Sequence, residues 1–411
     1  MSGGVTSATE QRLEELPAFL TAPATAKVLA ALPGSRAVGG AVRDALAGLP
    51  VADVDVAAPL PPEEIIARLS AAGCKVFETG LAHGTVTAVW EHQPIEVTAL
   101  RRDVLTDGRH AEVAWTTDWR EDAARRDFTI NAMSLGADGV LHDYFGGRED
   151  LAQGLVRFVG DPETRLAEDY LRLLRFFRFQ ARYGRGAPDV AALRAIRAAI
   201  PGLARLSVER IWMEIKRVLM VAEPAPALRL MAELGVLPAI LPEIAAPDIE
   251  CVARLVALAA PAEPLLRLAA LGGAAPGLAA RLKFSIAETR ALRFLQEAET
   301  PDAAVDVAEF RRWRARHAAV ALEMQEAALW LADARQGAAP RRATLRATLH
   351  AEAAPVFPLQ GRDLLAAGVS PGPALGALLA AVEAFWIAGG CTADHTACLA
   401  EAKRLMARYR P

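Results

Sequence analysis

The chain has 411 residues, of which 53% are hydrophobic, and its formal net charge is −3. This length predicts two or more domains with ample core, and the small net charge gives no global electrostatic case for nucleic-acid binding. No signal peptide or membrane span is expected, because the N-terminus is acidic and no uninterrupted apolar run reaches about 18 residues. The four cysteines form no C-x-x-C spacing, which predicts neither a zinc site nor disulfides and suits a reducing cytoplasm.

The first elements are predicted to be helical. One helix is expected from Thr9 to Leu20, ended by Pro23, and a second from about Thr25 to Ala31. Together residues 1–24 are predicted to form an N-terminal helical extension.

Paired glycines follow a predicted strand that begins at Arg36. Gly39 and Gly40 allow a tight turn and let a phosphate approach the backbone without a Cβ in the way. A short helix is predicted from Ala41 to Leu46, and its N-terminal amides would point at that phosphate. Arg43, one turn into this helix, can add a charge-assisted contact.

Two carboxylates follow within a dozen residues, in the predicted strand Asp53-Val54-Asp55-Val56. Residues i and i+2 of a strand share a face, so Asp53 and Asp55 project side by side. A divalent cation relieves the repulsion between such neighbours. A phosphate cradle followed by a carboxylate pair suits magnesium-dependent nucleotidyl transfer, in which one metal grips the triphosphate and the other activates an attacking hydroxyl.

The string from Gly39 to Asp44, with Asp53-Val54-Asp55, resembles the head of the class II tRNA nucleotidyltransferases and bacterial poly(A) polymerases. The resemblance covers residues 36–220 strongly and the rest loosely. It implies an α+β fold with an N-terminal nucleotidyltransferase head, built on a mixed or antiparallel β-sheet, and an all-helical remainder. The domains then expected are the extension 1–24, a catalytic head 25–150, a neck for base recognition and RNA binding 151–220, a body 221–340 and a tRNA-binding tail 341–411.

The rest of the head is predicted to be a helix from Pro61 to Ala72 and β-rich runs that form hairpins. These runs are Lys75–Glu78, Gly84–Trp90 and Ile95–Leu100. For Glu96, on the last of them, two roles stay open: a third acid that assists the metals, and an ordinary strand-edge acid. Residues 101–118 are predicted to be a loop, similar to the family's flexible loop that helps to switch between cytidine and adenosine addition.

The string Arg125-Arg126-Asp127-Phe128-Thr129-Ile130-Asn131-Ala132 is specific to the same superfamily. A helix is predicted to end near the two arginines, and the run after them is either a strand or a further helical turn. By resemblance Arg126 contacts the triphosphate, Asp127 orients an arginine or the ribose, and Asn131 caps or braces the local backbone. Leu141-His142-Asp143 is predicted to be a turn rather than a metal site.

The segment from Arg157 to Arg217 is basic, with 13 Lys and Arg residues against 7 Asp and Glu. Within an acidic chain this favours an RNA track, although a solvated helix face has the same composition. A single helix is predicted over Glu168–Phe179. Its face carries Glu168, Arg172, Arg175 and Arg178, and Asp169 is spaced for a salt bridge to Arg172.

This helix resembles the family's base-reading motif, Glu-Asp-x-x-Arg, with Tyr170 where many relatives have Pro or Ala. Cytosine and adenine both place an amino donor beside a ring-nitrogen acceptor, so Asp169 would accept from the amino group and Arg172 would donate to the ring nitrogen. Uracil and guanine would leave these charges unpaired. Arg175 and Arg178 would contact phosphate or base.

Beyond Ser207, a predicted N-cap, the sequence predicts helices cut by Pro and Gly. The expected helices are Ala227–Leu234, Ile249–Ala259, Leu265–Leu271, Ile286–Ala298, Val307–Arg335 and Arg341–Ala351. Pro358–Leu365 and Pro371–Gly376 resemble the family's tail, which would cradle the tRNA elbow.

The resemblance implies a cytoplasmic enzyme that adds or repairs the 3′-terminal CCA of tRNA without a template. Its substrates would be CTP and ATP, and two Mg²⁺ ions would be held by Asp53 and Asp55. Its partners would be nucleoside triphosphates and the tRNA 3′ end, with neither DNA nor membrane. Three alternatives are weighed: a poly(A) polymerase, which the modestly basic C-terminus disfavours; a non-catalytic RNA-binding protein, which the intact motifs disfavour; and an enzyme that adds only CC or only A, which stays open.

Overall fold

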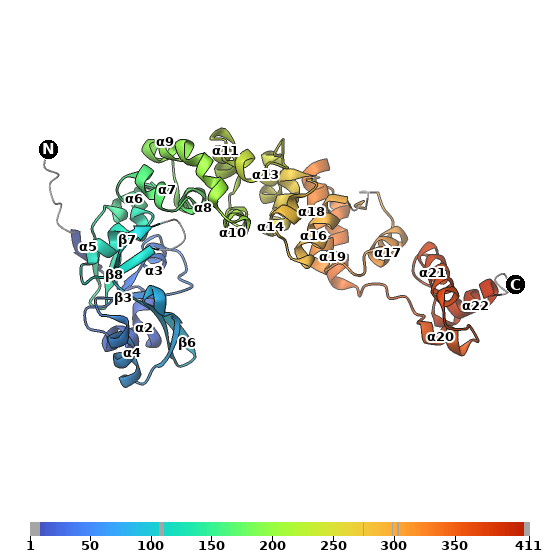
Figure 1. Cartoon of the computed structure of the whole chain (residues 1–411). Coiled ribbons are helices and arrows are strands. Elements are labelled where there is room, and N and C mark those ends of the chain that lie inside the picture. Colours follow the sequence, from blue (N-terminus) through green and yellow to red (C-terminus); the bar gives the residue numbers. More distant parts are fainter. Residues whose placement is uncertain (1–8, 107–110, 274, 298, 302–303, 407–411) are drawn as a thin grey trace. The chain divides into compact units, whose positions relative to one another are not determined.

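The computed structural model describes residues 9–106, 111–273, 275–297, 299–301 and 304–406. They form two compact units: Met1–Val221 with Pro226–Pro242, and Ala222–Ala225 with Glu243–Pro411. All the strands lie in the first unit, and the second is helical (Figure 1). The predicted α+β class is confirmed, whereas the finer division into five domains stays a prediction.

The head is built on an eight-stranded sheet in the order β1-β10-β9-β2-β3-β6-β5-β4. Strands β3 and β6 are parallel, and the other neighbours are antiparallel. The strands are β1 (Thr9–Arg12), β2 (Arg36–Val38), β3 (Asp55–Ala58), β4 (Lys75–Gly80), β5 (Thr85–Trp90), β6 (Gln93–Ala99), β9 (Ser134–Gly136) and β10 (Val140–Asp143). The predicted hairpins of β4, β5 and β6 are thus confirmed.

Strands β3, β5 and β6 bury one face and leave much of the other open. Helices α2 (Pro23–Ala31) and α4 (Pro62–Ala71) pack on β5 and β6. The side chains of the covered face are fully or almost fully buried: Val56, Val86, Ala88, Ile95 and Val97. Because side chains alternate along a strand, Asp55 and Glu96 belong to the opposite, open face.

The N-terminal helix expected over Thr9–Leu20 is wrong. Residues Thr9–Arg12 form β1, which pairs with β10, and only Ala18–Thr21 are helical (α1). Pro23 does not end a helix but opens α2, where its missing N–H costs nothing. The turn expected at His142 is likewise wrong, because β10 runs through it between β1 and β9.

The loop expected over residues 101–118 is largely a β-hairpin of β7 (Arg101–Thr106) and β8 (Ala111–Trp115). Residues 107–110, between the two strands in the sequence, lie outside the described residues. The ring of Trp115 packs on Gly84, where an added Cβ would lie 2.4 Å from it. The first strand was hard to predict because its sequence, Arg101-Arg102-Asp103-Val104-Leu105-Thr106, is largely polar.

Helices follow the head, and the helix expected over Glu168–Phe179 is two helices. α7 ends at Glu168, the backbone of Asp169 is extended (φ −152°, ψ 108°), and α8 begins at Leu171. The first unit's helices not yet bounded are α3 (Gly40–Leu46), α5 (Trp119–Ala124), α6 (Gly147–Gln153), α7 (Pro162–Glu168), α8 (Leu171–Tyr183), α9 (Val190–Ala199), α10 (Val208–Leu219) and α12 (Val236–Ile240), with α11 (Ala225–Glu233) beginning at the boundary. The run after Arg125-Arg126 is a 3₁₀ turn, η2 (Thr129–Asn131), and Ser207 caps α10 as predicted.

The second unit consists of helices. They are α13 (Ile249–Ala257), α14 (Pro264–Gly272), α15 (Leu278–Arg281), α16 (Ile286–Glu297), α17 (Val307–Arg316), α18 (Leu322–Gln336), α19 (Pro340–Ala351), α20 (Gly361–Ala366), α21 (Pro373–Ala388) and α22 (His395–Met406). The single helix expected over Val307–Arg335 is wrong, because the chain breaks between α17 and α18. Among the described residues no helix is both long and apolar enough to cross a bilayer.

Candidate active site

The paired glycines form the expected turn, and two arginines flank it. Gly39 has a φ of +66°, a conformation that side chains rarely adopt, and α3 begins at Gly40. A Cβ added to Gly39 would lie 3.1 Å from Nη1 of Arg126, and one added to Gly40 would lie 3.6 Å from Nη2 of Arg43. The turn therefore presents bare backbone beside two guanidinium groups, as an anion cradle requires.

Arg43 is buried rather than free to swing toward a ligand. It donates hydrogen bonds to the side chains of Asp44 and Asn131, and its guanidinium lies 4.5 Å from the ring centre of Tyr183. Asn131 was expected to brace the backbone, but its side chain instead links Arg43 to Asp127, to which it donates at 2.9 Å. Arg43 thus belongs to an internal network beneath the turn.

The carboxylates meet at the edge of the open sheet face. Asp53 precedes β3 rather than lying in it, and Asp55 is the first residue of that strand, directly opposite Glu96 of β6. Partial loss of hydration, together with the negative charges of Glu96 and Asp53, raises the pKa of Asp55, while Arg126 opposes this shift. Across the described part of the chain, no cation lies within ion-pair distance of these three acids.

These acids fit a hard cation that is held in an open site. Carboxylate oxygens are the ligands that Mg²⁺ prefers, and proteins commonly supply one or two of them while substrate phosphates complete the shell. Within the described ranges, no group of three or more Asp, Glu, His or Cys side chains is arranged to hold a metal ion without further ligands. Asp53 and Asp55, with Glu96 beside them, are therefore suited to a metal that arrives with a nucleotide.

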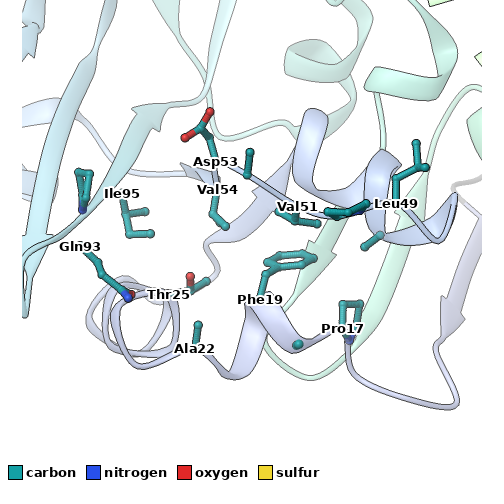
Figure 2. A pocket seen from close by; sticks show the side chains of 15 residues that line it. Pro17, Phe19, Ala22, Thr25, Leu49, Val51, Asp53, Val54, Gln93 and Ile95 are labelled. Carbon is teal, nitrogen blue, oxygen red and sulfur yellow. The ribbon is translucent and has the colours of Figure 1, made fainter. Parts of the chain in front are cut away.

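A cavity of about 770 Å³ lies beneath the segment that carries Asp53. Figure 2 shows the carboxylate of Asp53 at its rim, turned away from Phe19, while Val54 and Ile95 lie nearer the hollow. Residues 49–54, including Asp53, line this cavity, and Asp53 lies outside the strand ladder.

Arg126 is positioned by a buried acid. Asp122 lies 3.2 Å from Arg126 and 2.8 Å from Arg125. Burial by itself would raise the pKa of Asp122, but the two guanidinium groups and its hydrogen bonds hold the pKa below the usual value. The ion pair with Asp122 therefore holds the Arg126 side chain beside the glycine turn.

Asp127 fastens the head to α8. Its carboxylate lies 2.6 Å from Nη2 of Arg175 and accepts from Nε at 2.7 Å. Burial alone would raise the pKa of Asp127, but Arg175, Asn131 and the Phe128 amide more than offset this, so the pKa is lowered. Asp127 was predicted to orient either an arginine or the ribose, and in the structure it pairs with Arg175.

The expected salt bridge between Asp169 and Arg172 is not formed. Arg172 pairs with Glu168 instead, and Asp169 lies 2.7 Å from Nη2 of Arg210 on α10. The cause is the break between α7 and α8, since the helical i,i+3 spacing does not apply across an extended residue. Asp169 also accepts from the Leu171 amide at 3.0 Å, which fixes it at the start of α8.

The remaining arginine of the row, Arg178, pairs with the buried Glu214 of α10 at 3.3 Å, and Glu214 also holds Arg217 at 2.8 Å. Burial lowers the pKa of Arg178 to about 10, although Glu214 opposes this. Sequence reasoning missed both Glu214 and Arg210. The available signal was a charge on the apolar stripe of α10, which also contains Ile211, Ile215 and Val218.

Tyr170, the departure from the family's motif, has a matching partner. Its ring lies so close to Gly202 that a Cβ there would be 1.9 Å from Cε1. The guanidinium of Arg205 lies 5.8 Å from the ring centre. Tyr170 is thus packed against Gly202 and Arg205.

Comparison with known proteins agrees with this geometry. A family described as the poly A polymerase head domain matches residues 35–157, and one described as "Probable RNA and SrmB- binding site of polymerase A" matches residues 189–247. CCA tRNA nucleotidyltransferase 1, mitochondrial, of Mus musculus is 36% identical over 404 residues, covering 90% of this chain and 86% of the relative. The Danio rerio protein of the same name is 50% identical over 203 residues, covering 49% of this chain and 47% of the relative.

A solved structure covers nearly the whole chain. The Bacillus stearothermophilus CCA-adding enzyme in complex with CTP superposes with a TM-score of 0.72 and 27% identity, covering 94% of this chain and 98% of the other. Both this structure and the mouse enzyme match 90% or more of the chain. The chain therefore belongs to the CCA tRNA nucleotidyltransferase family.

Proposed function

We propose that this protein adds or repairs the 3′-terminal CCA of tRNA, using CTP and ATP without a nucleic-acid template. The observation that carries the proposal is the meeting of Asp53, Asp55 and Glu96 beside the Gly39–Gly40 turn. The names of the relatives support the product, and solved CCA-adding enzymes in complex with CTP and with tRNA support the substrates.

Asp53 and Asp55 would hold magnesium in this proposal, and Glu96 is placed to assist. Magnesium, when bound, neutralises phosphate charge and lowers the pKa of an attacking hydroxyl. The backbone amides at Gly40 and the guanidinium of Arg126 bind the triphosphate from the other flank. The tRNA 3′-hydroxyl then attacks the α-phosphate, and pyrophosphate leaves.

Asp169 and Arg172 serve as the template in this proposal. Both already have internal partners, but neither is saturated. A carboxylate offers about four lone-pair sites, and the neighbouring Leu171 amide and Arg210 occupy part of them. Arg172 uses Nη1 and one Nη2 hydrogen on Arg165, Glu168 and the Arg125 carbonyl, which leaves Nε–H to donate to a ring nitrogen.

Arg175 and Arg178 would add positive charge beside the bound nucleotide. The cytoplasmic location stays a prediction, and several relatives are named as mitochondrial enzymes. Addition of the whole CCA is favoured here over CC-only or A-only addition because relatives that span most of the chain are named for the complete end.

The test is to incubate the protein with tRNA that lacks one, two or three end nucleotides, supplying CTP and ATP singly and together. CTP alone should add two residues to tRNA that lacks all of CCA, and ATP alone should add one residue to tRNA that ends in CC. Both together should rebuild the end and stop. Long adenosine runs would show a poly(A) polymerase, and no incorporation at all would refute the proposal.

A further inference from the structure

One row of residues crosses the sheet outward from the catalytic edge. Asp55 of β3 lies opposite Glu96 of β6, Glu96 opposite Thr87 of β5, and Thr87 opposite Phe77 of β4. Residues directly opposite each other in a ladder point to the same face. Phe77, at the edge strand, therefore shares the open face with the carboxylates.

This face is polar, ordered and accessible. Thr87 bonds Thr79 at 2.9 Å, and in the next row Thr85 bonds Thr98 at 3.0 Å. Phe77 is 53% exposed on this face, although the side chains that fill the core of the head lie on the opposite one. Lys75, two residues earlier on the same strand and on the same face, is also exposed.

The glycine turn leaves this side of the carboxylates free for the second substrate. The cradle follows β2, which pairs with β3 on the side away from β6. A triphosphate in the cradle occupies that flank. An RNA end whose hydroxyl must reach Asp53 and Asp55 can then approach across β6, β5 and β4.

We propose that this open face, which we name the primer platform (Phe77, Thr87 and Glu96, with Lys75), holds the single-stranded 3′ end of the tRNA, and that Phe77 stacks on one of its bases. The proposal rests on the proposed function and adds a binding site for the growing end. Strands lie about 4.8 Å apart, so Phe77 is about 14 Å from the Asp55 row, a span of a few nucleotides. Base–aromatic stacking tolerates any sequence, which suits an end whose sequence changes with each addition.

Lys75 completes the chemistry that single-stranded RNA requires. Binding sites of this kind combine an aromatic platform with a cation that follows the phosphate backbone. The threonine hydroxyls between Phe77 and the carboxylates can bond ribose or phosphate oxygens. The platform has only one cation, so it would guide the end weakly and let it advance after each step.

The first experiment measures ATP addition to tRNA that ends in CC, at saturating ATP. Phe77→Ala should raise the KM for this tRNA by about 5- to 100-fold and leave kcat and the KM for ATP within about twofold. Phe77→Tyr, which keeps a ring, should behave like the wild type. Phe77→Leu, which keeps an apolar side chain without a ring, should behave like Phe77→Ala.

Matched controls separate stacking from strand damage. Glu78→Ala changes the exposed residue next to Phe77 on β4 without removing a ring, and should leave the tRNA KM unchanged. Lys75→Gln should raise this KM modestly. It should also reduce the slope of log KM against log salt concentration by about one. An unchanged KM in Phe77→Ala, or a wild-type KM in Phe77→Leu, would overturn the stacking role.

A second experiment locates the stacked base directly. 2-Aminopurine placed in turn at each unpaired 3′ position should lose fluorescence on binding at one position in the wild type, and at none in Phe77→Ala. If the wild type adds nucleotides but no position is quenched, the platform is wrong and the function stands. If the wild type adds no nucleotide to any tRNA, the proposed function itself fails.

Discussion

The two halves of the site handle charge in opposite ways. At the sheet edge, Asp53, Asp55 and Glu96 crowd together, and none has an ion-pair partner among the described residues. On α8, by contrast, every arginine of the row is matched by an acid: Arg172 by Glu168, Arg175 by Asp127 and Arg178 by Glu214.

Under the proposed function, this difference separates the part of the site that binds a metal ion from the part that distinguishes one base from another. Unpaired carboxylates repel one another, and a bound cation relieves this repulsion. They therefore favour the metal-bound state. Paired arginines are held in one geometry before the nucleotide arrives, which suits discrimination between similar bases. Removing one charge should therefore leave stability unchanged or raise it at the sheet-edge carboxylates. Removing an acid that pairs with an arginine of α8 should lower stability.

The largest effect is expected at the open carboxylates. Asp55→Asn or Asp53→Asn should lower kcat for nucleotide addition by about 10²–10³-fold or more, because the metal ions lose their anchor. Stability should be unchanged or slightly higher, because a repelled charge has been removed. Incorporation assays with urea unfolding measure both, and Glu63→Gln, a surface acid of α4, is the control; near-normal turnover would remove the metal-binding role.

The next effect concerns base choice. Asp169→Ala should cost about 1.5–3 kcal/mol of preference for C and A over U and G, because it removes one charge-assisted hydrogen bond. The measurement is the relative kcat/KM of the four nucleotides on tRNA that lacks CCA, and Arg172→Ala should act likewise. Equal loss for all four nucleotides, with the preference intact, would make these residues scaffolding.

Substitutions of Arg210 test the role of Asp169 further, because Arg210 contacts Asp169 directly. Arg210→Ala should relax base preference in the same direction as Asp169→Ala but less, since the carboxylate remains and only its orientation is loosened. Arg210→Lys should restore part of the preference. If Arg210→Ala changes stability and leaves the base preference intact, the ion pair with Asp169 only stabilises the packing of α10.

The smallest effect is one of stability, at a paired acid. Asp127→Asn should lower the free energy of unfolding by about 1–3 kcal/mol at pH 7, because Arg175 loses its counterion. The folded pKa of Asp127 is lowered, so its contribution is complete above the unfolded value of about 3.9 and is lost as pH falls through the folded value. The gap between wild type and variant should therefore close in acid, and a gap independent of pH would contradict this account.

Local motifs predicted the centre of the site well. The glycine turn, α3 and the start of β3 all depend on neighbouring residues, and so a short stretch of sequence was sufficient to place Gly39, Gly40 and Asp55. Asp53, predicted to lie in the same strand, instead precedes it. The strand pairing of Glu96 with Asp55 could only be suspected, because register is set between segments some forty residues apart.

Long-range partners account for most of the errors. β1 is a four-residue exposed strand that exists because β10 offers it an edge, and nothing within residues 9–12 signals this. The break at Asp169 was hidden because Glu168 to Phe179 continues a helical pattern across it. The Asp169 side chain is held in part by Arg210, which lies on another helix and so could not be inferred from neighbouring residues.

The contact of Tyr170 with Gly202 also limits how the sequence can change over evolutionary time. With the ring in place, any side chain at position 202 would overlap it, so a first substitution there is blocked. A chain with proline or alanine at position 170 has no such block. The two positions are therefore expected to covary, with the aromatic residue fixed only in lineages that already carry glycine at 202.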